Sequence, residues 1–203
     1  LDNYFWKGRR VFLTGHTGFK GAWLLLWLNK MGAEVFCYSL PPEGENNLYS
    51  DLFIQNGKSN NFSEIYGDIR DSDKLSRYIK EANPEVVFHL AAQPLVRESY
   101  DNPIYTWDVN VQGSLVLLEC LKNLQHKCSI VMVTTDKVYL NQEWSHGYRE
   151  NDILGGHDPY SASKSASEII INSFYKSYFK QKKIIILRAG NIIGGGDISD
   201  FRI

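Results

Sequence analysis

The sequence is poor in cysteine and in uninterrupted apolar stretches, and its charges balance. Only three of its 203 residues are cysteines, and none of them forms a CxxC pair, which argues against a disulfide scaffold or a metal site. No window approaches the roughly 20 apolar residues of a membrane-spanning helix, and the first residues lack the apolar core of a signal peptide. A formal net charge of -1 gives no electrostatic reason to bind nucleic acid. We therefore expect a cytoplasmic protein with no membrane or nucleic-acid partner.

Short β-branched or apolar runs alternate with longer helical patterns. The strands are expected at residues 10–14, 34–39, 62–66, 86–90, 129–133 and 184–188, and the helices at 19–31, 73–81, 104–124 and 161–179. This alternation predicts an α/β, Rossmann-like, doubly wound parallel sheet with helices on both faces, formed by residues 1–203 as one domain. Trp23 and Trp27 are four residues apart on the first helix, which predicts a place in the core.

Three glycines follow the first predicted strand and open an apolar helix. They are Gly15, Gly18 and Gly21 in the segment TGHTGFKG. A strand, a glycine turn and a helix N-terminus together form a pyrophosphate site. Gly15 would permit the turn, Gly18 the close approach of the phosphates, and Gly21 tight packing of the helix. The alternative is a glycine turn that binds nothing, because such a motif alone is weak.

The end of the second strand lacks the acidic residue that usually binds the adenosine ribose of NAD. It reads Tyr38-Ser39-Leu40, with no arginine there for the 2′-phosphate of NADP. We expect NAD, although this strand end does not decide between the two cofactors. After the third strand, Asp68 is placed to accept a hydrogen bond from the adenine amino group. Capping of the next helix is the alternative role, and the expected one for Asp71.

A tyrosine and a lysine lie one turn apart at the start of the last predicted helix. Tyr160 and Lys164 share one helix face, since residues at i and i+4 are neighbours. A nearby ammonium group favours the phenolate and lowers the tyrosine pKa from about 10. The pair would then act as a base toward a sugar or alcohol hydroxyl. YxxxK pairs also occur by chance, so the interpretation depends on the glycine loop and the alternating strands.

The fifth predicted strand ends in four polar residues, Thr134, Thr135, Asp136 and Lys137. Charges just beyond a strand are usually solvated, and an exposed Asp–Lys pair contributes little to stability. The alternative is that two hydroxyls, a carboxylate and an ammonium group converge on a substrate.

Several motifs together resemble the extended short-chain dehydrogenase/reductases from residue 9 to the end. They are TGHTGFKG, GDIRD, FHLAAQ, NVQGSLVLLE, the Thr-Thr-Asp strand end and YSASK. Within that family the chain is most similar to the CDP-glucose 4,6-dehydratases, through HLAAQPLVRESY, TTDKVY and RAGNIIGGGD. Nucleotide-sugar dehydratases carry Thr-Asp-Glu at the strand end. Here Lys137 replaces the glutamate, as is typical of the CDP-glucose branch.

The resemblance implies a set of residues for each role. Cofactor contacts would come from Gly15, Thr17, Gly18, Phe19, Gly21, Asp68, Ile69, Leu90, Ala91, Ala92, Tyr160 and Lys164. Substrate contacts would come from Gln93, Thr135 and Asn191, and catalytic groups from Thr135, Asp136, Lys137, Tyr160 and Lys164. The resemblance assigns no metal ion to the site. Asn110 is expected to organise the helix beside the site.

The implied reaction is the NAD-dependent dehydration of CDP-glucose to CDP-4-keto-6-deoxyglucose, in deoxysugar biosynthesis of the lipopolysaccharide O-antigen type. Tyr160, with Lys164 and Thr135, would serve oxidation at C4. Asp136 would act as the acid and Lys137 as the base in water elimination across C5 and C6. Hydride would then return to C6.

Two further expectations follow from the same resemblance. The C-terminal substrate-binding domain of the family has no counterpart here, so the chain is expected to be a fragment. A homodimer is expected through helices 104–124 and 160–179, with contact area from Tyr175, Tyr178 and Phe179.

Two rival functions stay open. One is another sugar-nucleotide enzyme of the family, such as a 4-epimerase, and the other is a non-catalytic NAD-binding module. A scaffold on a degenerate fold would predict loss of Tyr160 or Lys164.

Overall fold

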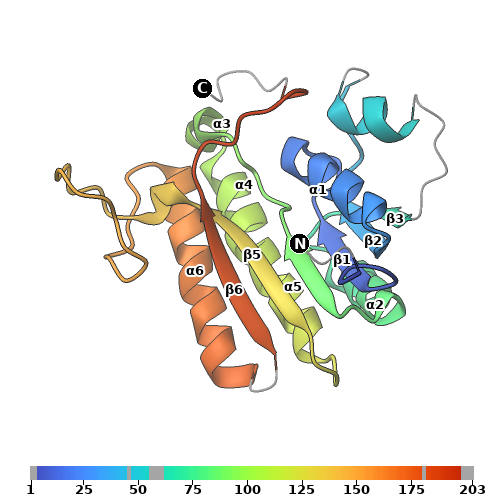
Figure 1. Ribbon diagram of the computed structural model, residues 1–203. Helices are drawn as coiled ribbons and strands as arrows, with labels where there is room; N and C mark the ends of the chain where they lie inside the picture. Colours follow the sequence, from blue (N-terminus) through green and yellow to red (C-terminus); the bar gives the residue numbers. More distant parts are fainter. Residues whose placement is uncertain (1–3, 45–46, 55–61, 180–181, 198–203) are drawn as a thin grey trace.

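The computed structural model describes residues 4–44, 47–54, 62–179 and 182–197. Within them, six strands form one sheet in the order β3-β2-β1-β4-β5-β6, and neighbouring strands pair in parallel (Figure 1). The strands are β1 (Arg10–Thr14), β2 (Glu34–Ser39), β3 (Phe62–Tyr66), β4 (Val86–His89), β5 (Ser129–Thr135) and β6 (Lys183–Ala189). The strand order reverses between β1 and β4, and ligands of such sheets bind at the carboxyl ends of the strands at this point.

Helices cover the two faces of the sheet, as expected for a doubly wound fold. Their bounds are α1 (Phe19–Lys30), α2 (Ser72–Ala82), α3 (Val96–Asp101), α4 (Pro103–Trp107), α5 (Gly113–Lys122) and α6 (Pro159–Tyr178), with π-helical turns η1 (Ser50–Ile54) and η2 (Asp108–Gln112) and a 3₁₀ turn η3 (Asp136–Val138). One core lies between the sheet and α1 with η1. The other lies between the sheet and α2, α5 and α6. The fold predicted from the alternating pattern is confirmed.

The helix expected at residues 104–124 differs from its prediction. A continuous helix over 104–124 is expected from the sequence, but a π-helical turn, η2, interrupts it between α4 and α5. π-Helical turns leave backbone groups outside the regular hydrogen-bond pattern, and they recur near functional sites. Here the turn carries Asn110, whose carbonyl accepts hydrogen bonds from the hydroxyls of Ser114 (2.7 Å) and Ser167 (2.8 Å).

Three predictions about packing are wrong. Trp23 and Trp27 are 43% and 58% exposed, so the shared helix face that they define is the outer face of α1. The Trp23 indole donates a hydrogen bond of 3.1 Å to the Gly195 carbonyl. Phe179 is 2% exposed and lies in the core, so it cannot supply contact area to a partner. Tyr175 and Tyr178 are exposed, as expected.

Capping residues explain where the helices around the site begin. The Asp158 carboxylate accepts from the Ser161 amide (2.9 Å), and Pro159 occupies the first turn, so α6 starts just before Tyr160. The Asp71 carboxylate accepts from the Lys74 amide (3.0 Å) and caps α2, which confirms the role predicted for it.

Parts of two expectations lie outside the described residues. The segment PPEGENN at residues 41–47 has the composition of a turn, and its residues 45 and 46 are not described. The resemblance expected from residue 9 to the end likewise includes residues 198–203. In the part of the chain that is described, no helix has both the length and the apolar character needed to cross a bilayer.

Candidate active site at the carboxyl edge of the sheet

The glycine loop joins β1 to α1 at the point where the strand order reverses. Gly15 has φ +77°, and a Cβ at this position would lie 2.6 Å from the Ala91 amide nitrogen. Gly18 forms the N-terminal boundary of α1 without a side-chain cap, and the first turn of α1 carries no acidic residue. The first turn of α1 therefore brings no negative charge of its own to this helix N-terminus, which suits an anionic group such as a pyrophosphate.

Thr14 and His89 connect the loops after β1 and β4. The Thr14 hydroxyl lies 2.8 Å from His89 Nδ1 and accepts from the Leu90 and Ala91 amides, each at 3.2 Å. His89 Nε2 lies 3.3 Å from the Ser114 hydroxyl. Burial, and secondarily the charge of Lys164, lower the pKa of His89 to about 3. His89 is therefore a neutral structural residue, as is expected of a strand histidine with no metal-ligand partner at a suitable spacing in the sequence.

The depressed pKa of His89 predicts acid sensitivity. The unfolded chain takes up this proton near pH 6.5, whereas the folded protein does so only near pH 3. The unfolded state thus binds more protons between these values, and stability falls as the pH is lowered. Between pH 7 and pH 5 this group should remove roughly 2 kcal/mol of unfolding free energy. Urea unfolding at pH 7, 6 and 5 should show a shallower pH dependence for His89→Gln, and equal slopes in both proteins would contradict the assignment.

Side-chain hydrogen bonds fix the loops at the carboxyl ends of β2 and β3. The Thr17 hydroxyl lies 2.6 Å from the Ser39 hydroxyl and donates to the Leu40 carbonyl (3.0 Å), which ties the glycine loop to the end of β2. Both carboxylate oxygens of Asp68 accept from the Arg70 guanidinium, at 2.9 Å and 2.6 Å. These bonds hold the pKa of Asp68 below its usual range. Asp68 is thus an ionised acceptor, and sequence reasoning missed its partner Arg70.

Tyr160 and Lys164 lie on the first turns of α6 and are 9% and 8% exposed. Burial is the main reason that the pKa of Lys164 falls from 10.5 to about 8, and the charge of Lys20 on α1 adds to it. Lys164 therefore keeps its charge near neutral pH but releases the proton more readily than an exposed lysine. Lys20 belongs to the glycine loop motif, and sequence reasoning had not connected it with this site.

Asn110 on η2 supports the helix that carries this pair. Its side-chain amide donates to the Ser163 hydroxyl on α6 (2.9 Å) and to the Gln93 carbonyl (3.1 Å). Its side-chain oxygen accepts from the Gln93 amide (2.9 Å). This confirms the role expected for Asn110. The Gln93 side chain is buried and donates to Thr106 (2.7 Å) and to the Leu95 carbonyl (3.1 Å), so its amide nitrogen already has protein acceptors.

β5 continues two residues beyond its predicted end, through Thr134 and Thr135, because its pairing with β6 extends that far. Thr135 is buried, and its hydroxyl donates to the Asp136 carboxylate (3.1 Å) and accepts from the Lys137 amide (3.3 Å). Asp136 and Lys137 follow in η3, with side chains 55% and 44% exposed and 4.0 Å apart. The Lys137 ammonium reaches the side-chain oxygen of Asn191 at 3.5 Å. The structure thus brings Thr135, Asp136, Lys137 and Asn191 together on one rim.

The predicted residues fall into two groups along the carboxyl edge. The group predicted to contact the cofactor comprises the glycine loop with Thr17 and Phe19, Asp68 and Ile69 after β3, and Leu90, Ala91 and Ala92 after β4. The second group comprises the end of β5 with Asn191, and it faces α6 through the packing of η3 against α6. Sequence reasoning missed Glu168 and Arg188, whose hydrogen bonds connect α6 with β5 and β6. The only sequence cue was a glutamate four residues beyond Lys164.

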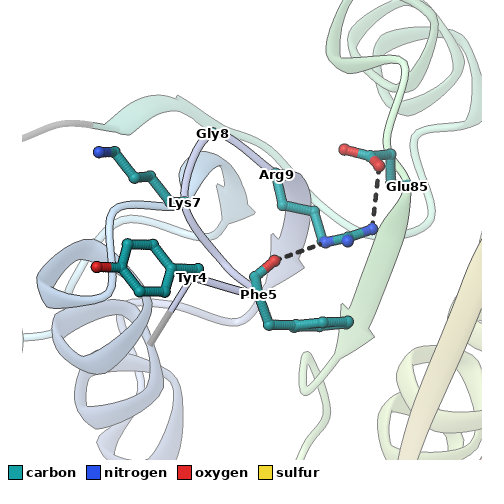
Figure 2. Close-up of a pocket in the computed structure, with 6 residues that line it drawn as sticks. All are labelled: Tyr4, Phe5, Lys7, Gly8, Arg9 and Glu85. Atoms are coloured by element: carbon teal, nitrogen blue, oxygen red, sulfur yellow. Dashed lines mark hydrogen bonds and ion pairs between the residues drawn. The ribbon is translucent and has the colours of Figure 1, made fainter. Parts of the chain in front are cut away.

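An open hollow of about 490 Å³ lies at the opposite edge of the sheet (Figure 2). It is lined by Tyr4, Phe5, Lys7, Gly8, Arg9 and Glu85. Arg9 and Glu85 form an ion pair of 3.1 Å just before β1 and β4. Because parallel sheets bind ligands at their carboxyl ends, this hollow is not the active site. Among the described residues, no group of three or more histidine, cysteine, aspartate or glutamate side chains could hold a metal ion.

Comparison with known proteins agrees with this geometry. The family model described as GDP-mannose 4,6 dehydratase matches residues 12–191. A CDP-glucose 4,6-dehydratase from Salmonella typhimurium is 46% identical over the whole chain, and the match covers 57% of that protein. The chain therefore spans little more than half the length of such relatives.

Solved structures show the same fold. An epimerase from Methanothermobacter thermautotrophicus superposes with a TM-score of 0.81 at 28% identity, covering 96% of this chain and 55% of that one. A dTDP-glucose 4,6-dehydratase from Bacillus anthracis in complex with NAD gives 0.70 at 25% identity, covering 88% and 54%. Since the family model spans most of the sequence, the chain belongs to the family described as GDP-mannose 4,6-dehydratase, among the extended short-chain dehydrogenase/reductases.

Proposed function

We propose that the protein containing this chain is an NAD-dependent 4,6-dehydratase that converts CDP-glucose to CDP-4-keto-6-deoxyglucose. The observation that carries the proposal is the convergence of Thr135, Asp136 and Lys137 at the end of β5, facing a helix that carries Tyr160 and Lys164. The 46% identical Salmonella relative bears the name CDP-glucose 4,6-dehydratase. The choice of CDP-glucose as substrate rests on that likeness and on Lys137, because a lysine at this position is typical of the CDP-glucose branch of the family.

The glycine loop fits the pyrophosphate of NAD. A Cβ on Gly18 would meet only the Gly15 carbonyl, at 3.5 Å, so the backbone is accessible at this position. The Asp68 carboxylate, held ionised by Arg70, would accept from the adenine amino group. Bound here, NAD would accept hydride from C4 of the sugar and return it to C6.

The chain's own residues would supply the proton transfers. Tyr160 would remove the O4 proton, assisted by the positive charge of Lys164 and by the Thr135 hydroxyl. The 4-ketone makes the C5 hydrogen acidic, and Lys137 would remove it while Asp136 protonates the departing O6. Both Asp136 and Lys137 lie on the exposed rim, where a bound nucleotide sugar would exclude water from them.

The test is a substrate comparison with the full-length protein. It should be incubated with NAD and, separately, with CDP-glucose, dTDP-glucose and GDP-mannose, with the alkaline absorbance of a 4-keto-6-deoxy sugar as the measurement. We expect product from CDP-glucose only, and none from Tyr160→Phe, which should still bind NAD. Product from another nucleotide would reassign the substrate, and a C4 epimer without dehydration would favour the epimerase alternative.

A homodimer is part of the proposal. The surface formed by α4 and α6 exposes Ile104, Trp107, Ile169, Tyr175 and Tyr178. Aromatic and aliphatic side chains of this kind are enriched in the centre of protein interfaces.

The cysteines Cys37, Cys120 and Cys128 are free and buried, which supports action in a reducing compartment such as the cytoplasm. The C-terminal substrate-binding domain expected from the resemblance would complete the nucleotide site.

A further inference from the structure

A buried carboxylate continues the helix face that carries Tyr160 and Lys164. Glu168 lies four residues after Lys164 and eight after Tyr160, so the three side chains follow one another along one side of α6. Glu168 is fully buried. A charge in such a place requires close partners, because an unpaired buried carboxylate is strongly unfavourable.

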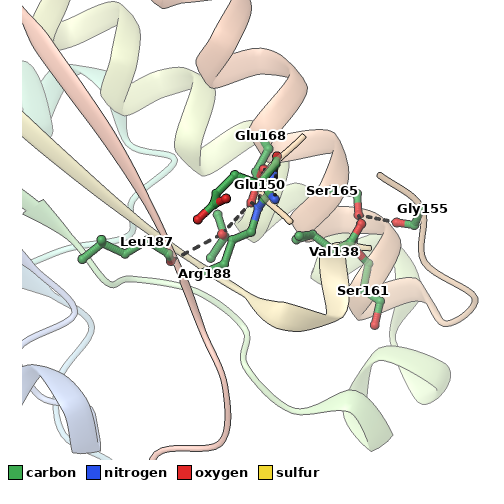
Figure 3. A network of polar contacts seen from close by, with 9 residues as sticks. Val138, Glu150, Gly155, Ser161, Ser165, Glu168, Leu187 and Arg188 are labelled. Carbon is green, nitrogen blue, oxygen red and sulfur yellow. Dashed lines mark hydrogen bonds and ion pairs between the residues drawn. The ribbon is translucent and has the colours of Figure 1, made fainter. Parts of the chain in front are cut away.

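The partners of Glu168 come from the two strands that form the rim of the site. The Arg188 guanidinium on β6 donates to both carboxylate oxygens, with Nη2 at 2.7 Å and Nε at 3.0 Å and 3.1 Å. The Thr134 hydroxyl on β5 donates to the same carboxylate at 2.7 Å. Figure 3 shows Glu168 and Arg188 facing each other between α6 and β6. One carboxylate thus fastens the helix to both strands.

Arg188 also reaches the loop that follows Lys137. Its Nη1 donates to the Glu150 carbonyl at 3.0 Å, and its guanidinium lies 4.7 Å from the centre of the Tyr139 ring. The hydrogen bonds to Glu168 raise the pKa of Arg188 above its usual range. The guanidinium therefore stays charged at every working pH.

A second contact fastens the same loop to α6. The Ser165 hydroxyl lies 2.9 Å from the Val138 carbonyl and also contacts the Gly155 carbonyl. Ser165 directly follows Lys164, and Val138 directly follows Lys137. The helix and the β5 end are thus joined within one residue of the groups proposed to act on the sugar.

Stability alone does not explain this arrangement. Burying an ion pair costs desolvation energy, and well-packed apolar residues of similar size often stabilise a fold as well or better. The position of the pair is informative: Thr134 pairs with Arg188, and the next pair along the two strands is Thr135 with Ala189. The carboxylate therefore holds β5 one residue before Thr135.

We propose that Glu168 and Arg188 are positioning residues for the reaction. They set the distance between the acid–base group at the end of β5, Thr135 to Lys137, and the Tyr160–Lys164 pair on α6. This inference rests on the proposed function. Two proton transfers at different sugar atoms require both groups to fit one bound substrate, and a misplacement of about 1 Å costs roughly 100-fold in rate.

The test separates positioning from stability with a charge-free pair. In the full-length protein, E168L/R188M replaces the ion pair with apolar side chains and should keep the unfolding free energy near that of the wild type. We expect its kcat to fall roughly 100-fold while KM changes little, because the nucleotide contacts are untouched. Arg9→Met, which breaks the ion pair with Glu85 at the opposite edge, is the matched control and should keep full activity.

A second variant covers the case in which the double substitution does not fold. Thr134→Val removes the hydroxyl bonds to Glu168 (2.7 Å) and to the Leu187 carbonyl (3.5 Å) and leaves the ion pair in place. It should fold and lose about tenfold in kcat, since the bond from Thr134 on β5 to Glu168 is gone while the bonds from Arg188 on β6 remain. Wild-type kcat in Thr134→Val, or in a folded E168L/R188M, would overturn the proposal.

A readout without turnover keeps the two proposals distinct. The ¹³Cζ resonance of Tyr160 in ¹³C-tyrosine-labelled protein, assigned with Tyr160→Phe, reports on the position of α6 relative to β5. We expect it to move in E168L/R188M and to stay in place in Arg9→Met. An inactive wild type would refute the proposed dehydratase, whereas an unmoved Tyr160 resonance in a folded E168L/R188M would refute positioning by Glu168 and Arg188.

Discussion

The Gly21→Ala variant is expected to lose about 3 kcal/mol or more of unfolding free energy, a large share of the 5–15 kcal/mol typical of a domain. A Cβ on Gly21 would overlap the Gly15 carbonyl oxygen and would lie 2.7 Å from the His16 Cα. Both are backbone atoms, so no side-chain rotation can relieve the overlap. Thermal unfolding of the chain should show a midpoint roughly 10 °C below that of the wild type.

Gly18→Ala is the matched control three residues earlier in the same loop. A Cβ there would meet only the Gly15 carbonyl oxygen at 3.5 Å, an ordinary contact, and the Gly18 φ of -78° suits any residue. Stability should therefore change by no more than about 1 kcal/mol. If the pyrophosphate lies against Gly18, NAD affinity measured by calorimetry should nevertheless fall about tenfold.

The two variants distinguish packing from binding. Equal loss of stability in both would mean that the loop has a different conformation from the one described. Equal NAD affinity in the wild type and Gly18→Ala would move the pyrophosphate away from this glycine. The predicted division of roles within the loop, with Gly21 for packing and Gly18 for phosphate approach, would then be wrong.

Local patterns predict most of the sheet because a buried parallel strand is recognisable by itself. β1, β2 and β3 begin and end at the expected residues, since each is rich in β-branched, aromatic or apolar residues. β5 is longer than expected because Thr134 and Thr135 continue to pair with β6. That pairing depends on a strand more than 40 residues away, and a hydrophobic pattern contains no information about it.

Helix faces are harder to predict than helices. The spacing of Trp23 and Trp27 shows that they share a face but not that this face meets the sheet. Leu25 and Leu28, one to two residues away, take the buried side of α1 instead. The same limit applies to Phe179, which follows α6 and turns back into the core.

Some residues of the candidate site can likewise be predicted from the sequence, and others cannot. The glycine loop and the Tyr160–Lys164 pair can be predicted because their chemistry requires short, fixed spacings in the sequence. Glu168 and Arg188 cannot, because each acquires its role from a partner on another strand or helix. The structure is needed to show that Arg188 bonds Glu168 and that Thr14 contacts His89.

Lys164→Met is expected to stabilise the unliganded chain by ~3 kcal/mol at pH 7 while abolishing turnover in the full-length protein. Burial lowers the pKa of Lys164 from 10.5 to about 8. Below pH 8 the folded protein therefore contains a buried ammonium group that the unfolded chain keeps in water at no cost. Methionine fills similar space without charge, so this cost disappears.

The pH dependence of the difference in unfolding free energy between Lys164→Met and the wild type shows whether the buried ammonium group causes it. Between pH 8 and pH 10.5 the unfolded lysine holds its proton and the folded one does not, so the stability of the wild type rises with pH. Lys164→Met lacks this rise, and the gap between the two proteins should narrow by most of its size over that range. Urea unfolding from pH 7 to pH 10.5 measures it, with Lys176→Met, an exposed position on the same helix, as the control.

A more stable but inactive Lys164→Met would show that burial of this ammonium group is maintained at the expense of stability. The same low-dielectric surroundings that disfavour the charge also strengthen its effect on the neighbouring Tyr160. A variant that is no more stable than the wild type, with parallel pH curves, would instead mean that Lys164 is solvated in the free protein. Its influence on Tyr160 would then arise only after the cofactor and substrate have closed over the site.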